Sequence, residues 1–384
     1  MKKKDFFITT GFLMIIFGMC FMITFFRNEK GLLYFENRNI KECPTLNYEN
    51  VFENNYFGDV EEHLSDSFKL RNRILKFDTF LNLKLLKRPV VNGIYKSDKH
   101  YMTRWQRWWP YDYKEDLEKM TLGYKGLNEA LKEKGVYFLY VGVPEHSYVF
   151  SDDYPKYLLN KYEEWHNIEK DFFAALNQNN ISNIKMSDFI KDKEMEYTKT
   201  DHHFSYIGAK NVYENIIQKI NENTEFKLDG NVELVKMPEP FKGSYSRKLF
   251  FVGGYNDDYY TYNPDFEFER FDDGEKTLSK LFFPEENKFD GAVGYGVYMN
   301  GDKGFTKIAT HRENLPNILV YGDSFTNPLE TLLVRNANNF YSFDFRYQKN
   351  KTLTEIVDEY NPDIVICIRD NLMYLNREEN GIVE

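Results

Sequence analysis

The pattern of apolar and polar residues divides the chain into three parts. Residues 6–26 form an apolar run of 21 residues without a charged side chain, long enough to cross a bilayer as a helix. Residues 60–86 carry apolar side chains at helical spacing, and we expect one or two packing helices there. From residue 115 onward, amphipathic stretches alternate with short apolar runs, which is typical of an α/β domain.

This alternation predicts a mainly parallel sheet covered by helices, because the apolar runs read as strands buried on both faces. A β-rich, antiparallel insertion is expected at about 227–316, where Phe, Tyr, Asp and Gly are frequent and short alternating segments replace the helices. We expect helices at 115–134, 162–176 and 206–220, and strands at 136–143, 181–186, 318–321, 340–345 and 364–368.

The same pattern predicts the domain organisation. We assign residues 1–30 to a cytoplasmic tip and transmembrane anchor, 31–114 to a connector and helical membrane-proximal module, and 115–384 to the α/β domain with its insertion. A short strand is expected at 90–95. The aromatic-rich residues 101–109 fit either a carbohydrate-stacking surface or ordinary packing, and packing is the favoured interpretation.

The N-terminus favours a retained anchor over a cleaved signal peptide. Three lysines precede the apolar run, so we expect a cytoplasmic N-terminus and an exported remainder. The run is longer than the apolar part of most signal peptides, and Arg27–Lys30 offers no small-residue cleavage site. Met19 before Cys20 is a poor lipoprotein pattern.

Charge and cysteine content exclude some partners. The net charge is −10; the first thirty residues contribute five basic side chains against Asp5 and Glu29, or +3, which leaves −13 outside. Such a surface repels nucleic acid and anionic lipid headgroups, so we expect no nucleic-acid partner. Three cysteines give no disulfide framework, and only Cys43 and Cys367 could pair, since Cys20 lies in the apolar run.

Two distant segments supply the parts of a nucleophilic site. The first contains Asp201, His202 and His203; the second places Ser324 directly after the strand expected at 318–321. A serine becomes nucleophilic when a base takes its proton and a third group orients that base. In an extended segment, side chains two residues apart point the same way. We therefore expect Asp201 to orient His203, with His202 pointing oppositely in a supporting role.

Other interpretations of these residues stay open. The Asp-His-His run precedes the helix expected from Tyr206, so it could cap that helix, and Ser205 suits the same role. The run could also bind a metal ion. We expect no metal and no cofactor, because further ligands are missing and adjacent histidines that diverge are poorly placed to share an ion.

Taken with their order, the motifs resemble the DHHW-motif proteins, relatives of the alginate O-acetyltransferases within the SGNH hydrolase-like superfamily. The resemblance covers nearly the whole chain. Its motifs are Glu36–Arg38 followed by Pro44, Leu64–Arg71, Asn92–Tyr95, Thr200–Phe204, Phe241–Tyr245, Tyr298–Asp302, Gly322–Phe325 and Asp344–Tyr347.

The resemblance implies an SGNH hydrolase-like three-layer sandwich and a triad of Ser324, His203 and Asp201, in the permuted order of that family. Phe204 replaces the motif's tryptophan, which keeps apolar packing but removes an indole N–H. The usual Gly-x-Asn-Asp pattern is also missing. The first candidates for oxyanion donors are therefore the N–H groups of Ser324 and Phe325. Further candidates for oxyanion or substrate contacts are Gly301, Gly243 and Arg346, and His202, Phe204 and Asp323 are expected to support the site. For Arg346 and Arg369, structural salt bridges are the favoured interpretation.

The hypothesis that follows is a membrane-anchored, extracytoplasmic O-acyltransferase of the serine-dependent SGNH type. Its acceptor would be a cell-surface or secreted polysaccharide, and the resemblance implies a multipass membrane acyltransferase as partner. With the same triad, water as acceptor would make it an acetyl esterase, and D-alanyl transfer is a further variant. A non-catalytic polysaccharide-binding or assembly protein that keeps the fold is the alternative from another class.

Overall fold

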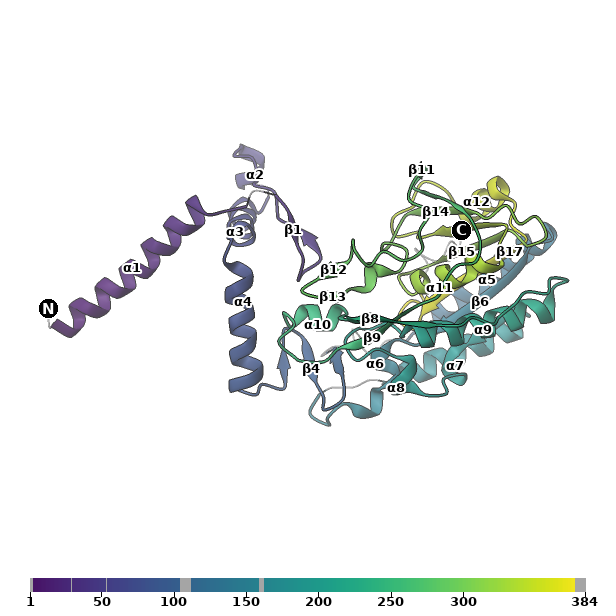
Figure 1. Cartoon of the computed structure of the whole chain (residues 1–384), viewed down its shortest axis with the longest axis horizontal. Helices are drawn as coiled ribbons and strands as arrows, with labels where there is room; N and C mark the ends of the chain where they lie inside the picture. The colour runs from purple at the N-terminus through teal and green to yellow at the C-terminus, as the bar shows by residue number, and fades with distance from the viewer. Residues whose placement is uncertain (1–2, 29, 53, 104–111, 159–161, 377–384) are drawn as a thin grey trace. The chain divides into compact units, whose positions relative to one another are not determined.

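The computed structural model of the 384-residue chain describes residues 3–28, 30–52, 54–103, 112–158 and 162–376 (Figure 1). The chain divides into two compact units. The smaller unit comprises Met1–Ile94 with Ser246–Gly254, and the larger comprises Tyr95–Tyr245 with Tyr255–Glu384. Most of the aromatic-rich segment at 101–109 lies outside the described residues, so its role stays a prediction.

The smaller unit begins with the apolar helix α1 (Lys3–Phe25). Its stretch Lys3–Ile23 has a mean hydropathy of 2.3 and no part buried by the rest of the chain, which fits a signal anchor or a signal peptide. The remaining elements are short: β1 (Leu32–Leu33), β2 (Arg38–Asn39), α2 (Tyr48–Phe52), α3 (Tyr56–Ser67), α4 (Arg71–Phe80), a π-helical turn (Leu81–Leu85) and β3 (Val90–Val91).

The helices expected at 60–86 are present, but the expectation that their apolar residues pack is only half correct. Phe68 and Leu83 are buried, whereas Ile74, Phe77 and Phe80 on α4 are exposed. Helical spacing shows that the residues share a face; it does not show whether water, protein or another medium covers that face.

The larger unit contains an eight-stranded sheet in the order β11-β10-β14-β16-β15-β17-β6-β7. The five strands from β16 to β7 are parallel, and β14, β10 and β11 continue the sheet antiparallel. The strands are β6 (Tyr137–Val143), β7 (Asn183–Lys185), β10 (Glu269–Asp272), β11 (Glu275–Lys276), β14 (Phe305–Ala309), β15 (Ile318–Gly322), β16 (Asn339–Phe343) and β17 (Ile364–Asp370).

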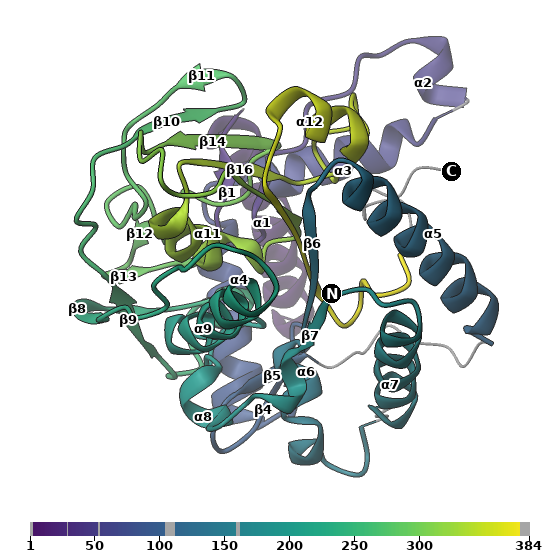
Figure 2. The ribbon, with the colours of Figure 1, turned by 90° about the vertical axis from the view of Figure 1, so that its right-hand side faces the viewer.

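Helices cover both faces of this sheet, as Figure 2 shows for α5 and α7 against α9 and α11. One face packs against α5 (Lys114–Glu133), α7 (Tyr162–Gln178) and α12 (Leu353–Tyr360). The other packs against α9 (Tyr206–Asn223) and α11 (Thr326–Leu333). Strands β15 and β17 are buried almost throughout, because both faces are covered. The predicted α/β fold class with a mainly parallel sheet is confirmed.

The segment at 227–316 is β-rich, but it is not a separate antiparallel module. Strands β10, β11 and β14 extend the main sheet, and β13 pairs in parallel with β8 in a second sheet. That sheet has the order β12-β13-β8-β9, with β8 (Val235–Phe241), β9 (Asp257–Thr261), β12 (Lys288–Phe289) and β13 (Ala292–Val293).

Short elements complete the larger unit: β4 (Ile94–Lys96) at its boundary, β5 (Tyr101–Thr103), α6 (His146–Val149), α8 (Lys193–Glu196), α10 (Ser244–Lys248) and single 3-10 turns at Ser151–Asp153, Met186–Asp188, Tyr295–Val297 and Val334–Asn336.

None of the three cysteines, all of which lie within the described residues, forms a disulfide. Cys43 is exposed, whereas Cys367 is buried in β17, where its sulfur lies 3.6 Å from the hydroxyl of Tyr124. The pairing of Cys43 with Cys367 that the sequence left open is therefore not formed.

Candidate functional site

Ser324 lies where the central strand β15 turns into helix α11. Gly322 ends the strand, and an added Cβ there would lie 2.3 Å from the carbonyl oxygen of Ile368 on β17, so only glycine allows this close approach. Asp323 then ties the turn to β17, because its carboxylate accepts the N–H groups of Phe325 at 2.9 Å and Asp370 at 3.2 Å. The serine is thereby held at the carboxyl end of the parallel strands.

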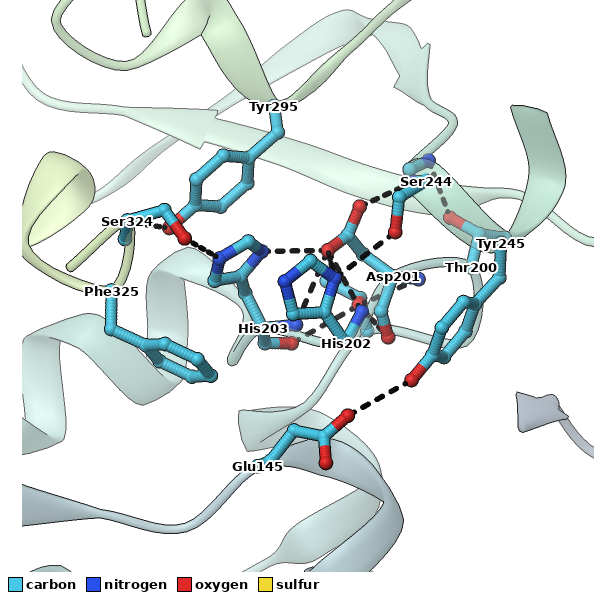
Figure 3. Close-up of polar contacts among 12 residues, drawn as sticks. Glu145, Thr200, Asp201, His202, His203, Ser244, Tyr245, Tyr295, Ser324 and Phe325 are labelled. Atoms are coloured by element: carbon cyan, nitrogen blue, oxygen red, sulfur yellow. Dashed lines mark hydrogen bonds and ion pairs between the residues drawn. The ribbon is translucent and has the colours of Figure 1, made fainter. Parts of the chain in front are cut away.

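The structure brings Ser324, His203 and Asp201 into one hydrogen-bonded line (Figure 3). His203 Nε2 lies 2.8 Å from Ser324 Oγ, and its Nδ1 lies 2.7 Å from Asp201 Oδ1. Because the carboxylate accepts from Nδ1, that nitrogen carries the ring proton and Nε2 is free to accept the serine proton. Ser324 is half-buried, while Asp201 and His203 are buried.

Backbone groups hold the Asp201 carboxylate in place. Oδ1 accepts the N–H groups of His202 at 2.8 Å and His203 at 3.2 Å, and Oδ2 accepts the N–H of Ser244. Gly243 is needed for this approach, since an added Cβ would lie 2.2 Å from Asp201 Oδ2. A carboxylate fixed by so many donors keeps its charge and its orientation toward His203.

The segment that carries Asp201 is a bend, fixed by hydroxyl and carboxylate groups. Thr198 Oγ1 accepts the N–H of Asp201 at 3.1 Å. Asp257, at the start of β9, accepts the N–H groups of Lys199 at 2.6 Å and Thr200 at 3.0 Å. Ser205 then caps α9, because its hydroxyl accepts the N–H of Gly208 at 3.2 Å; the sequence had left this role open for it.

The prediction that His202 points away from His203 is wrong. The two rings lie 3.8 Å apart, and His202 Nδ1 lies 3.1 Å from Asp201 Oδ1 and 3.1 Å from Ser244 Oγ. The alternation argument assumed extended backbone, whereas the segment bends. Only His203 contacts Ser324, so the position of the serine distinguishes the two histidines.

The same bend creates a geometry that could hold a metal ion. The ligand atoms of Asp201, His202 and His203 lie within 4.8 Å of one another, so the argument that the histidines diverge is also wrong. However, both Nδ1 atoms already face Asp201 Oδ1, and an ion there would have to replace these hydrogen bonds. The buried position of Asp201 and His203 adds to that cost.

Shared interactions with Asp201 separate the pKa values of the two histidines. Burial raises the pKa of Asp201, but the charge of His202 and the hydrogen bonds from both imidazoles hold it well below its ordinary value. Burial lowers the pKa of His202, and Asp201 more than offsets this, so that pKa is raised. Burial and then the nearby charge of His202 lower the pKa of His203 to about 4. His203 is therefore neutral, and able to accept a proton, near pH 7.

Aromatic rings enclose the imidazole of His203. Tyr295 stacks on it with ring centroids 3.7 Å apart and an interplanar angle of 9°, and the Tyr295 hydroxyl donates to the carbonyl oxygen of Ser324 at 2.7 Å. Phe325 lies 4.5 Å from the same imidazole. Phe204 is buried with its ring 5.3 Å from that of Phe325, so it supplies packing to the site.

The structure leaves few of the predicted oxyanion donors free. The N–H of Phe325 donates to Asp323, that of Gly243 donates to Thr200 Oγ1 at 2.9 Å, and that of Gly301 donates to the carbonyl of Tyr298 at 3.1 Å. Each of these N–H groups already has an acceptor, so an oxyanion there would have to replace an existing hydrogen bond; the three assignments stay predictions. Within the described part of the chain, the N–H of Ser324 has none.

The two arginines proposed near the site take part in ion pairs, as the alternative interpretation expected. Arg346 binds Asp344 at 2.6 Å and Asp302 at 3.1 Å. Arg369 is buried and lies 3.9 Å from Asp323. Both therefore stabilise the serine side of the site.

Sequence reasoning assigned no role to Tyr295, Ser244, Glu145 and Asn371, although Ser244 lies in the motif Phe241–Tyr245. Glu145 accepts a hydrogen bond from the Tyr245 hydroxyl at 3.2 Å, and its N–H donates to Asn371 Oδ1 at 2.7 Å. Asn371 Nδ2 is buried and has no hydrogen-bond partner among the described residues. Asn371 directly follows β17, the strand next to β15, and that position was the available signal for it.

Together these groups have the parts of a serine nucleophile site: a hydroxyl, a neutral imidazole and an oriented carboxylate. The geometry suits acyl transfer, in which the hydroxyl forms an ester and the imidazole moves the proton. No group in the arrangement requires a cofactor for that chemistry.

Comparisons with known proteins bear on the family and the fold of the chain. The family model described as the SGNH hydrolase-like domain of the acetyltransferase AlgX matches residues 103–249, which include Asp201 and His203 and end before Ser324. A sequence comparison with curated proteins gave no match.

Solved structures share the fold. PatB1 from Bacillus cereus with a sulfonyl adduct has a TM-score of 0.61 and 19% identity, covering 73% of this chain and 95% of that one. A DHHW family protein from Eubacterium siraeum has a TM-score of 0.56 and 18% identity, covering 76% and 95%. The family model bears out, over residues 103–249, the resemblance to SGNH hydrolase-like acetyltransferases that the motifs predicted, and the solved structures bear out the fold.

Proposed function

We propose that the chain is a membrane-anchored, extracytoplasmic O-acyltransferase that transfers an acetyl group to a polysaccharide hydroxyl. The observation that carries the proposal is the line from Asp201 through His203 to Ser324, with distances of 2.7 and 2.8 Å. The match of residues 103–249 to an acetyltransferase family supports the acetyl group.

In the first half of the reaction, Ser324 Oγ attacks the carbonyl carbon of the acyl donor while His203 Nε2 takes its proton. Asp201 stabilises the imidazolium that forms. The N–H of Ser324 would stabilise the oxyanion, and Asn371 Nδ2, on the next strand end, is our candidate for a second donor. Collapse of the intermediate leaves an acetyl ester on Ser324, and the imidazolium returns the proton to the leaving group.

In the second half, a sugar hydroxyl attacks the serine ester. His203 takes the hydroxyl proton and then returns it to Ser324 Oγ as the acetylated sugar leaves. Water in place of the sugar would release acetate, so the esterase alternative differs only in the acceptor. Polysaccharide as acceptor and a multipass membrane acyltransferase as the source of acyl groups rest on the family resemblance.

The anchor part of the proposal rests on α1, whose length and hydropathy suit a membrane span. We propose that α1 is retained, with the N-terminus in the cytoplasm. Retention of the N-terminal residues in the mature membrane-bound protein, detected by mass spectrometry, tests it; a mature chain beginning after residue 26 would contradict it.

The chemical proposal is tested with purified protein, p-nitrophenyl acetate as donor and oligosaccharides as acceptors. Mass spectrometry of acetylated oligosaccharide is the expected readout, and activity should survive dialysis against EDTA. Acetate release without any acetylated sugar would favour the esterase. Oligosaccharide binding without either product, unchanged in Ser324→Ala, would favour the non-catalytic binding protein.

A further inference from the structure

Helix α4 of the smaller unit presents large apolar side chains away from its own unit. Ile74 is 50% exposed, Phe77 61% and Phe80 43%, and they recur every three residues along one side of the helix. Thr79, on the opposite side, is buried. Leu85 and Leu86 continue the exposed apolar surface beyond α4, at 63% and 62%.

Basic side chains are interleaved with this surface. Residues 71–88 contain six arginines and lysines against Asp78 alone, a net charge of +5 in a chain of net charge −10. Within the described residues, Arg73, Lys76, Lys87 and Arg88 form no ion pair with a carboxylate, and Lys84 contacts only a backbone carbonyl, that of Gly253 at 3.5 Å. We call residues 71–88 the apolar–basic segment. Exposed apolar residues flanked by uncompensated basic ones are typical of helices that lie in a membrane interface.

The apolar–basic segment begins where α1 ends. The N–H of Asn28 donates to the carbonyl of Ser67 at 2.8 Å, and the N–H of Lys69 donates to the carbonyl of Phe26 at 3.3 Å. If α1 crosses a bilayer, these bonds hold the first turn of α4, from Arg71, at the level where the chain leaves the hydrocarbon.

An apolar groove of about 570 Å³ lies beside the same junction. Met19 and Ile23 on α1 form one wall, and Phe57, Leu64 and Ile74 contribute to the other. In water this groove and the exposed face of α4 would be costly to hydrate, whereas acyl chains at the bilayer surface would cover both.

We propose that the apolar–basic segment is an interfacial element that lies on the outer leaflet, with Ile74, Phe77 and Phe80 in the headgroup boundary. Its basic side chains bind anionic phospholipid, except for Arg71, which pairs with Glu36 and Asp66. This inference rests on the proposed anchoring by α1. It also narrows the sequence argument that the exported part repels anionic headgroups, because residues 71–88 are basic, whereas residues 31–70 of the same unit carry eight acidic side chains against three basic ones.

A membrane surface explains the observations better than a protein partner would. Charge complementarity selects an anionic partner, the backbone bonds to Phe26 and Asn28 set the depth, and Arg and Lys stems can extend past apolar contacts to reach phosphates. A protein surface would account for the apolar residues but not for their place beside the end of α1.

The test uses the full chain with Cys20→Ala and Cys43→Ser, leaving Cys367 buried, in vesicles of phosphatidylcholine with or without phosphatidylglycerol. A nitroxide is attached at Phe77→Cys, and the matched control carries it at Glu129→Cys on the exposed side of α5. Collisions with oxygen and with a water-soluble nickel chelate are measured. We expect the Phe77 position to favour oxygen and exclude nickel, and the Glu129 position to show the reverse.

Charge is tested in the same Phe77→Cys background with Arg73→Gln, Lys76→Gln and Lys84→Gln combined. We expect the ratio of oxygen collisions to nickel collisions at position 77 to shift toward the value measured at the water-exposed position 129. We also expect this ratio no longer to depend on phosphatidylglycerol. Aqueous accessibility at Phe77 in anionic vesicles would overturn the proposal, as would protection from both reagents, which indicates a protein cover. Fluorophosphonate labelling of Ser324 in the same vesicles reports the triad separately, so failure of one proposal is distinguishable from failure of the other.

Discussion

Helix α9 of the larger unit and helix α4 of the smaller one read alike in the sequence, since both carry apolar residues at helical spacing. In the structure, α9 buries its apolar side from Tyr206 to Ile220 in the core. Helix α4 leaves Ile74 and Phe77 exposed. The same periodicity therefore occurs in a buried helix and in an exposed one. The two helices differ in the charge of the surrounding residues and in the elements that lie next to them.

The contrast separates two tasks. The larger unit fixes a polar line of three side chains with aromatic packing, so its interior must be rigid. The smaller unit presents apolar and basic side chains together, which suits a membrane surface. If the two tasks are independent, substitutions in one unit should leave the readout of the other unchanged.

The largest effect is expected for His203→Gln. The variant loses the proton acceptor 2.8 Å from Ser324 Oγ, and we expect the acyl-transfer rate to fall by about 10³–10⁴-fold. Measurement of p-nitrophenyl acetate turnover checks it, with circular dichroism as a control for folding. Turnover within tenfold of the parent protein would mean that another group is the base.

The second prediction compares one buried and one exposed phenylalanine. Phe204→Ala should cost about 3–5 kcal/mol of unfolding free energy, because Phe204 is buried beside Phe325 and its loss leaves a cavity. Phe77→Ala should change stability by less than about 0.5 kcal/mol, since Phe77 is 61% exposed. Urea unfolding in detergent measures both, and equal costs would remove the distinction between the two units.

A third prediction concerns the glycine behind the carboxylate. Gly243→Ala places a methyl group 2.2 Å from Asp201 Oδ2, so the carboxylate must move, and we expect turnover to fall about 10²-fold. Gly230→Ala is the control, because its Cβ would meet Ile217 at 3.5 Å, an ordinary contact. Similar turnover for the two variants would show that the position of Asp201 matters little.

The smallest effect is expected for His202→Asn. The pKa of His203, about 4, is lowered by burial and then by the charge of His202, so removing that charge should raise it. A higher pKa means that His203 becomes protonated sooner as the pH falls, and the acid limb of kcat/KM should move to higher pH. Turnover near pH 8 should change little. An unshifted acid limb would contradict the electrostatic coupling of the two histidines.

Much of the larger unit could be predicted because its signals are local. Buried strands such as β6 and β15 are continuous apolar runs, and their alternation with helices implies parallel pairing. The joining of β10 and β14 to the main sheet could not be predicted, because it depends on pairing between residues far apart in sequence. In the smaller unit, periodicity predicted the helices but not whether protein, water or membrane covers their apolar faces.

The candidate site was predictable to a similar extent. Ser324 was identified from its position after a strand and from its motif, and His203 from the assumed alternation of side chains and from the family resemblance; the structure places the two in contact. The direction of His202 was predicted wrongly, because a bend replaces the extended backbone that the argument assumed. Tyr295 was missed because its place over His203 depends on how the β-rich segment folds, which no local pattern reveals.

The central claim is that Ser324 is the nucleophile of an acyl-transfer site, and labelling with a fluorophosphonate probe tests it most directly. The probe should attach to Ser324 in the full chain, identified by peptide mass spectrometry, and labelling should be lost in Ser324→Ala and reduced in His203→Gln. Labelling should persist in the variant with Arg73→Gln, Lys76→Gln and Lys84→Gln. Equal labelling of Ser324→Ala, or none in the parent protein, would contradict the account.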